Sequence, residues 1–183
     1  MPTHVALLRG INLAGRNKVA MADLRAVVSS LGHTDVSTYI QSGNVVFTAA
    51  DSPALAADLE RAIASALGVS PSVVVLTRDE LVAVVRANPY PDEPNPRALH
   101  AVFLTAAPTS ATGEALDAAL QRVGGAGSRD TARLIGRTIY LHTPDGFGRS
   151  KLAELIGQSR KPELTGTARN WATVTKLLAM CDT

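Results

Sequence analysis

The feature that most constrains the fold is a short apolar run that occurs twice in the chain. Val5–Leu8 is continuously apolar, and Ala101–Leu104 repeats it later, each run directly after a histidine, His4 or His100. Continuous apolar runs of this length are typical of central β-strands that are buried on both faces. The recurrence predicts two units, each built around one such strand, that arose by internal duplication.

The first half of the chain predicts a ferredoxin-like unit. A helix is expected over residues 21–31, a hairpin over 34–48, a second helix that opens at Asp51-Ser52-Pro53, and a strand over 73–76. Together with the first apolar run these elements have the order βαββαβ, which is that of the ferredoxin-like fold. Thr77 and Glu80 have capping-box spacing and predict one further helix.

The hairpin over 34–48 is expected to turn within Ser42-Gly43-Asn44. Because side chains alternate between the two faces of a strand, a two-residue turn there fixes which residues share a face. One face is predicted to hold Ile40, Val45 and Phe47, and the other Tyr39, Gln41, Val46 and Thr48.

The second half repeats this order less clearly. Residues 89–96 contain four prolines and predict a linker. It would separate a first subdomain at 1–88, which includes the extra helix, from a second subdomain at 97–183. A hairpin over 131–142 is expected to turn at Gly136-Arg137, and a degenerate closing strand is expected over 163–168. The predicted class is therefore α/β (α+β), with two ferredoxin-like βαββαβ subdomains, the second of them degenerate.

Composition narrows the classes of function. The formal charge of +2 arises from 18 basic and 16 acidic residues, so any electrostatic site must depend on local clusters. Cys181 is the only cysteine, which excludes an internal disulfide and a thiolate metal site. No stretch approaches the ~20 apolar residues of a spanning helix. We expect a cytoplasmic protein without a membrane partner, a metal or a cofactor, and the sequence leaves the oligomeric state open.

Four motifs resemble one known family. They are Leu8–Asn12, Gly15–Val19, Tyr39–Val45 and Thr167–Trp171. They are similar to a bacterial family catalogued as domain of unknown function 1697, and the resemblance covers nearly the whole chain. It implies two ferredoxin-like α/β subdomains and brings no established activity. The family often has a second glycine before Gly15 and a proline before Met21, where this chain has Ala14 and Ala20.

The loop after the first strand is the main candidate for a binding site. Gly10 and Gly15 allow the backbone to approach an anion, while Arg16, Asn17 and Lys18 supply donors near the start of a helix. The alternative is a long solvated loop that is closed by asparagine turns.

Two later segments resemble this loop chemically. Gly146–Lys151 is a glycine-rich turn that enters a helix, although it lacks the glycine spacing of a Walker loop and could be an ordinary helix cap. Arg169-Asn170 places a cation and a natural N-cap at the start of the last helix. If the three basic segments converge, the ligand-binding residues would be Arg9, Asn12, Gly15, Arg16, Asn17, Lys18, Gln41, Ser42, Asn44, Arg149, Ser150, Lys151, Arg169 and Asn170.

Other chemistry finds less support in the sequence. Tyr39 and Tyr140 lie on the less apolar sheet faces, which is one feature of single-strand RNA binders, but such faces could equally be interfaces between subdomains. No pair of ligand-type residues has metal-site spacing. His4 and His100 occupy equivalent positions at strand starts, so we expect them to be structural.

The sequence therefore predicts a binding protein for a phosphate-bearing ligand, either a nucleotide or nucleic acid, that uses a basic Asn/Gly-rich cleft. A small-molecule enzyme that uses the same cleft is the first alternative, without assigned catalytic residues, and a protein-association module is the second. The sequence leaves open whether the protein is an enzyme.

Overall fold

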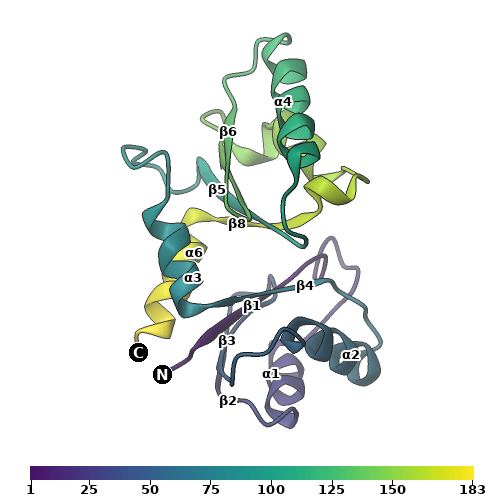
Figure 1. Ribbon diagram of the computed structural model, residues 1–183. Coiled ribbons are helices and arrows are strands. Elements are labelled where there is room, and N and C mark those ends of the chain that lie inside the picture. The colour runs from purple at the N-terminus through teal and green to yellow at the C-terminus, as the bar shows by residue number, and fades with distance from the viewer. The chain divides into compact units, whose positions relative to one another are not determined.

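Two four-stranded antiparallel sheets form the framework of this computed structural model, which describes residues 1–183 (Figure 1). The first part of the chain contains β1 (His4–Leu8), α1 (Met21–Ser30), β2 (Thr34–Tyr39), β3 (Asn44–Thr48), α2 (Leu55–Leu67), β4 (Val73–Thr77) and α3 (Arg78–Arg86). The second part contains β5 (Leu99–Leu104), α4 (Ser110–Gly124), β6 (Thr131–Ile135), β7 (Thr138–His142), η1 (Phe147–Arg149), α5 (Lys151–Gly157), η2 (Pro162–Leu164), β8 (Gly166–Asn170) and α6 (Trp171–Cys181).

The two sheets have the same topology. Their strand orders are β2-β3-β1-β4 and β6-β7-β5-β8, with β1 and β5 in central positions. This arrangement, with helices between the strands, confirms the predicted α/β class with two ferredoxin-like subdomains. The duplication of the sequence itself stays a prediction.

The chain divides into two compact units. The first comprises Met1–Ala83 with Thr175–Thr183, and the second comprises Val84–Val174. The proline-containing range 89–96 falls within the second unit, and the predicted subdomain boundaries remain a prediction. None of the helices combines the length and the apolar character needed to cross a membrane.

The core of the first unit lies between its sheet and helices α1 and α2, which cover one face of the sheet (Figure 1). β1 is buried along its whole length because β3 and β4 flank it on both sides. Ala6 and Leu8 face the helices and pack with Leu24, Leu59 and Ile63. The apolar run therefore forms a central strand, as expected.

The predicted hairpin turn is wrong in length. β2 ends at Tyr39 and β3 begins at Asn44, so four residues, 40–43, form the connection instead of two. Val45 and Phe47 lie in the core as predicted, but Ile40 lies in the connection and is 51% exposed. Its φ of 50° takes it out of the strand, which is why the expected alternation stops one residue earlier.

The next two helices, α2 and α3, begin differently. α2 begins at Leu55, later than the expected opening at Asp51-Ser52-Pro53, and its N-cap Ala54 provides no side-chain cap, although Ser52 Oγ accepts from the N–H of Ala54 (3.2 Å). The carboxylate of Asp51 contacts Nε2 of His4 at 2.8 Å. The capping box before α3 is confirmed, because Glu80 accepts from the Thr77 backbone N–H (2.8 Å) and Thr77 Oγ1 accepts from that of Glu80 (3.1 Å).

The second unit contains a complete four-stranded sheet. Its hairpin turns at Gly136-Arg137 as predicted, and the residues Ala132, Ile139 and Leu141 lie in the core with helices α4 and α5. The closing strand exists, but it is β8 at Gly166–Asn170, a few residues beyond the expected 163–168. It pairs with β5 over five residue pairs, so its weak apolar pattern did not prevent strand formation.

We predict opposite effects for two glycine-to-alanine substitutions in the second unit. A Cβ at Gly166 would lie 2.5 Å from the backbone oxygen of Phe103 in the paired strand, so Gly166→Ala should destabilise the protein by about 1–3 kcal/mol. Gly113 lies in α4 with open space around it, so Gly113→Ala should stabilise by about 0.5–1 kcal/mol. Urea unfolding of both variants checks this, and equal free energies of unfolding would contradict it.

Candidate functional site

The loop after β1 folds into a short hairpin, which we call the arm and define as Asn12–Asn17. The backbone N–H of Asn12 donates to the carbonyl of Asn17 (3.0 Å), and that of Arg16 donates to the carbonyl of Leu13 (2.8 Å). The two central residues, Ala14 and Gly15, have φ values of 48° and 79°. Positive φ at both positions is what a type I′ hairpin turn requires.

Asparagine side chains hold the base of the arm. Asn12 Nδ2 donates to the carbonyls of Val19 (2.9 Å) and Gln41 (2.8 Å), while its Oδ1 accepts from the N–H of Val19 (2.8 Å). Asn17 Nδ2 donates to the carbonyl of Gly10 (2.9 Å). Both amide hydrogens of Asn12 are thus committed to backbone groups, so this residue shapes the arm and has no hydrogen left to donate to a ligand.

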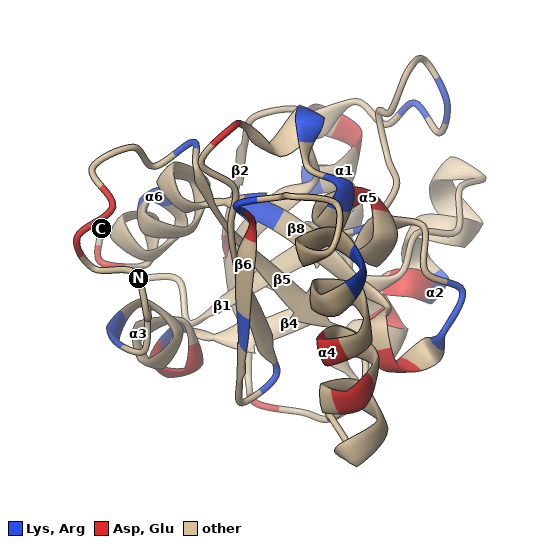
Figure 2. Cartoon of the chain, turned by 90° about the horizontal axis from the view of Figure 1, so that it is seen from above, with Lys and Arg blue, Asp and Glu red and all other residues tan.

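The cations of this loop have no such partners. The side chains of Arg9, Arg16 and Lys18 form no hydrogen bond or ion pair, and Arg16 and Lys18 are exposed. Figure 2 shows cationic and acidic residues on most elements of the chain, whereas residues 9–18 contain three cations and no acidic residue. The loop is therefore a local concentration of positive charge.

The remaining predicted residues of the first unit close the β2–β3 connection. Asn44 is fully buried, and its Nδ2 donates to the carbonyl of Tyr39 (3.0 Å) and to Oγ of Ser42 (2.8 Å). Gly43 has a φ of 76°, and a Cβ there would lie 2.7 Å from Cδ1 of Ile11. Gln41, by its carbonyl, ties this connection to the arm.

In the second unit, the predicted segment Arg149–Lys151 lines a cavity of about 640 Å³, which we call the α4–α5 pocket. Its polar lining also includes a cation that the sequence gave no reason to select, Arg122 in the last turn of α4. The remaining charged lining residues are Asp130, Asp145 and Glu154.

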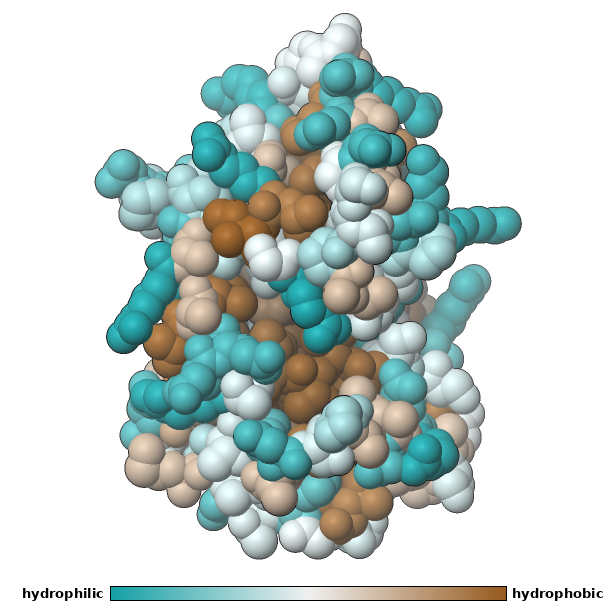
Figure 3. Space-filling view, viewed as in Figure 1, coloured by the Kyte–Doolittle hydropathy of each residue, from teal (hydrophilic) through white to brown (hydrophobic).

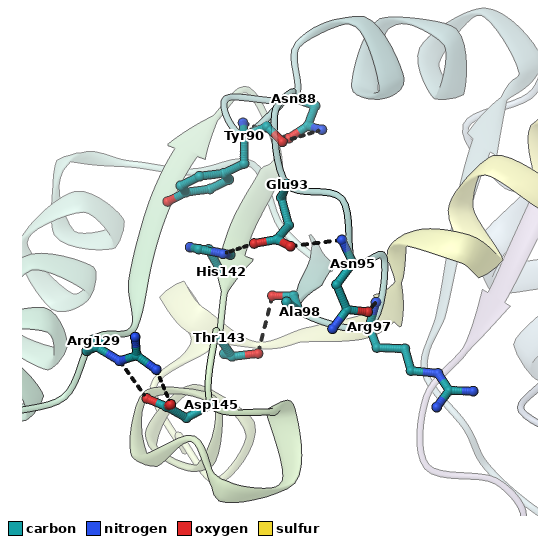
Figure 4. Close-up of polar contacts among 10 residues, drawn as sticks. All are labelled: Asn88, Tyr90, Glu93, Asn95, Arg97, Ala98, Arg129, His142, Thr143 and Asp145. Carbon is teal, nitrogen blue, oxygen red and sulfur yellow. Dashed lines mark hydrogen bonds and ion pairs between the residues drawn. The ribbon is translucent and has the colours of Figure 1, made fainter.

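Three of the six charged side chains that line the α4–α5 pocket, Asp145, Lys151 and Glu154, form ion pairs. Lys151 contacts Glu154 at 2.8 Å, and Asp145 is held by two contacts from Arg129, whose hydrogen bonds lower the pKa of that carboxyl group (Figure 4). Arg122 and Arg149 form no ion pair and no side-chain hydrogen bond. The N–H groups of these two guanidinium groups are therefore available to donate hydrogen bonds to an anion.

Ser150 serves the local structure of the α4–α5 pocket. Its buried Oγ accepts from the N–H of Ala153 (2.8 Å) as the N-cap of α5 and donates to Oδ2 of Asp130 (2.8 Å). This bond fixes the loop before β6 to the start of α5. The predicted helix-cap alternative for this segment is therefore present alongside the cavity.

The third predicted segment is placed elsewhere in the second unit. Arg169 is buried on β8, where its Nη1 donates to Oγ1 of Thr167 (2.6 Å) and to the carbonyl of Ala168 (2.9 Å), and burial lowers its pKa to about 10. Asn170 accepts from the N–H of Thr173 (3.1 Å), as an N-cap does. Neither residue lines the α4–α5 pocket.

A cluster that sequence reasoning missed lies at the end of β7. His142 Nε2 is 2.6 Å from Oε2 of Glu93, whose Oε1 accepts from the N–H of Asn95 (2.8 Å), so the carboxylate lies between the two (Figure 4). The Asn95 N–H and His142 lower the pKa of Glu93. The Tyr90 ring packs against His142, and its buried hydroxyl has no hydrogen-bond partner. Tyr90, Glu93 and Asn95 are close together in the sequence, but only the fold brings His142 to them.

The two equivalent histidines differ in their surroundings. His4 contacts Asp51 and also lies 2.7 Å from Oγ1 of Thr3 by its Nδ1. His100 is buried against Phe147, with a ring-centroid distance of 3.9 Å, and its Nδ1 has no partner. Burial lowers the pKa of His100 to about 4, so its ring is neutral at pH 7.

The family model described as "Protein of unknown function (DUF1697)" matches residues 1–140. The chain belongs to this DUF1697 family. The match includes the arm and the β2–β3 connection, whereas Arg149–Lys151 and Arg169 lie beyond the matched residues.

A solved structure resembles this DUF1697 chain along its length. It is that of a conserved bacterial protein, SP0830, from Streptococcus pneumoniae, with 24% sequence identity, a TM-score of 0.73 and 98% of each chain covered. At this identity the likeness shows the fold alone. A search of curated proteins finds no match. No group of three His, Cys, Asp or Glu residues is placed to hold a metal ion.

We predict that Ala14→Gly stabilises the protein. Ala14 has a φ of 48°, which is unfavourable for a residue with a Cβ, and relief of this strain should exceed the added flexibility of glycine, for a net gain of about 0.5 kcal/mol. Ala26, exposed in the interior of α1, is the control, and Ala26→Gly should lower stability by about 1 kcal/mol instead. Urea unfolding measures both, and a loss of stability in Ala14→Gly would contradict the prediction.

We predict a pH-dependent stability from His100. Its pKa is about 4 in the folded protein and near 6.5 when unfolded, so the unfolded chain binds more protons between these values. The contribution of His100 is complete above pH 6.5 and is lost as pH falls towards 4, by up to about 1.4 kcal/mol per pH unit. Urea unfolding at pH 7 and pH 5 should show a smaller difference for His100→Phe than for the unsubstituted protein; identical differences would contradict it.

Proposed function

We propose that the protein binds a small phosphate-bearing ligand in the α4–α5 pocket. The observation that supports this proposal is the presence of two unpaired guanidinium groups, Arg122 and Arg149, in the lining of one cavity. Arginine is the side chain best suited to phosphate because its donors match the geometry of two phosphate oxygens.

The size of the pocket favours a small molecule over a polymer. Its volume of about 640 Å³ falls within the ~300–1,000 Å³ of small-molecule sites. A mononucleotide fits this description, because Oδ1 of Asp130 and Oε1 of Gln158 in the same lining form no hydrogen bond and can accept from hydroxyl or amino groups. Nucleic acid remains the alternative phosphate-bearing partner from the sequence.

Binding is a simpler proposal than catalysis for this pocket. The one hydroxyl next to a carboxylate, that of Ser150, already caps α5 and donates to Asp130. We place the protein in the cytoplasm on the ground that its single cysteine, Cys181, is a buried free thiol.

The proposal predicts that both arginines contribute to affinity. In isothermal titration with adenosine monophosphate and with inorganic phosphate as separate probes, Arg122→Gln and Arg149→Gln should each weaken binding by about tenfold, since each removes a charge-assisted hydrogen bond. Arg133, exposed on β6 and outside the pocket, is the matched control, and Arg133→Gln should bind as the unsubstituted protein does.

Two results would overturn this assignment. One is the absence of measurable binding of either probe to the unsubstituted protein. The other is unchanged affinity in the Arg122→Gln/Arg149→Gln double variant. A salt-sensitive affinity for single-stranded RNA that exceeds the affinity for the mononucleotide would favour the nucleic-acid alternative.

A further inference from the structure

The first unit carries a second surface that the pocket does not explain. Leu13, at the end of the arm, is 63% exposed, and Ile40, in the β2–β3 connection, is 51% exposed. Their sequence neighbours Asn12 and Gln41 are joined by a hydrogen bond from the Asn12 side chain to the Gln41 carbonyl, which holds the arm next to the β2–β3 connection. We call Leu13, Arg16, Lys18 and Ile40 the arm surface. Figure 3 shows several apolar patches among hydrophilic residues on the face that it draws, so exposed apolar groups are not confined to the arm surface.

The backbone at this surface is held in an unfavourable conformation. Ile40 has a φ of 50°, which is an outlier for a β-branched residue, and Ala14 in the arm has a φ of 48°. Neither side chain gains burial in return, since both are exposed. Strain that the surrounding hydrogen bonds maintain, without a gain in packing, is a feature of binding surfaces.

The charge of the arm surface specifies the sign of its partner. Arg16 and Lys18 are exposed, and no carboxylate pairs with either of them or with the neighbouring Arg9. A partner that combines negative charge with apolar groups would complement both features of the surface.

The chemistry of the exposed side chains favours lipid over nucleic acid. Proteins that bind single strands stack bases on aromatic rings, whereas the exposed apolar groups here are aliphatic and the nearby Tyr39 is half-buried. Aliphatic side chains flanked by lysine and arginine suit the boundary between acyl chains and anionic headgroups. The turn of a hairpin can insert into that boundary, because a bilayer surface needs no preformed groove to accept it.

We propose that the arm surface binds the surface of an anionic lipid bilayer. Leu13 and Ile40 enter the acyl boundary, while Arg16 and Lys18 contact headgroup phosphates. Two aliphatic side chains make such a contact weak and reversible. This proposal departs from the expectation of no membrane partner, which was based on the absence of a spanning stretch; a surface contact needs no such stretch.

Co-sedimentation of the full chain with lipid vesicles tests this proposal. Vesicles of phosphatidylcholine mixed with phosphatidylglycerol should retain the protein, and phosphatidylcholine alone should not. Leu13→Gln should weaken binding about tenfold and Lys18→Gln about fivefold, because one removes apolar burial and the other a headgroup contact. Both side chains are exposed, so neither variant should change the urea unfolding midpoint.

Matched controls come from the same unit. Leu31→Gln changes another exposed leucine, and Lys176→Gln another exposed lysine, both outside the arm. These controls, and Arg149→Gln, should bind vesicles as the unsubstituted protein does, which separates this surface from the α4–α5 pocket.

Three results would overturn the proposal. The first is no retention of the unsubstituted protein by phosphatidylglycerol vesicles. The second is an equal loss in Lys18→Gln and Lys176→Gln, which indicates attraction by net charge alone. The third is binding to duplex DNA, but not to vesicles, that Leu13→Gln and Lys18→Gln weaken, which assigns the arm to nucleic acid.

Discussion

The pairing of each central strand with two neighbours is the interaction on which the structure depends. β1 and β5 are buried along their whole length, so every backbone N–H and carbonyl in them needs a partner within the protein. β3 and β4 supply these partners for β1, and β7 and β8 supply them for β5. The requirement explains why β8 forms although its sequence, Gly166–Asn170, is not a typical strand. Without β8, the backbone N–H and carbonyl groups along one edge of β5 would have no partners.

Different interactions organise the loops that follow these strands. The arm is organised by asparagine side chains that bond to backbone groups, so it presents its cations from an ordered hairpin. The α4–α5 pocket is organised by ion pairs and by the Ser150 cap, which leave two arginines available. In both places the polar groups that could bind a ligand are those that the local structure does not itself use.

Several elements were predictable because their signals are local. The two apolar runs and the capping box of Thr77 with Glu80 each depend on residues close together in sequence. The β2–β3 connection was not, because the left-handed conformation of Ile40 contradicts the preference of a β-branched residue. Of the two arginines of the proposed site, Arg149 belongs to a glycine-rich segment that the sequence selects, whereas Arg122 lies in a helix that gives no reason to choose it. Glu93 and His142 likewise meet only in the folded chain.

By itself, the sequence determined the order of strands and helices, the two buried central strands and the concentration of cations after the first of them. These follow from hydrophobic periodicity and turn chemistry, which act over a few residues. Only the tertiary structure decided which polar groups remain available. Asn12 is committed to Val19 and Gln41, and Asp145 to Arg129, while Arg122 and Arg149 form no ion pair and no side-chain hydrogen bond. The physical reason is that hydrogen bonds and ion pairs form between groups that are near in space, and their distances are set by packing.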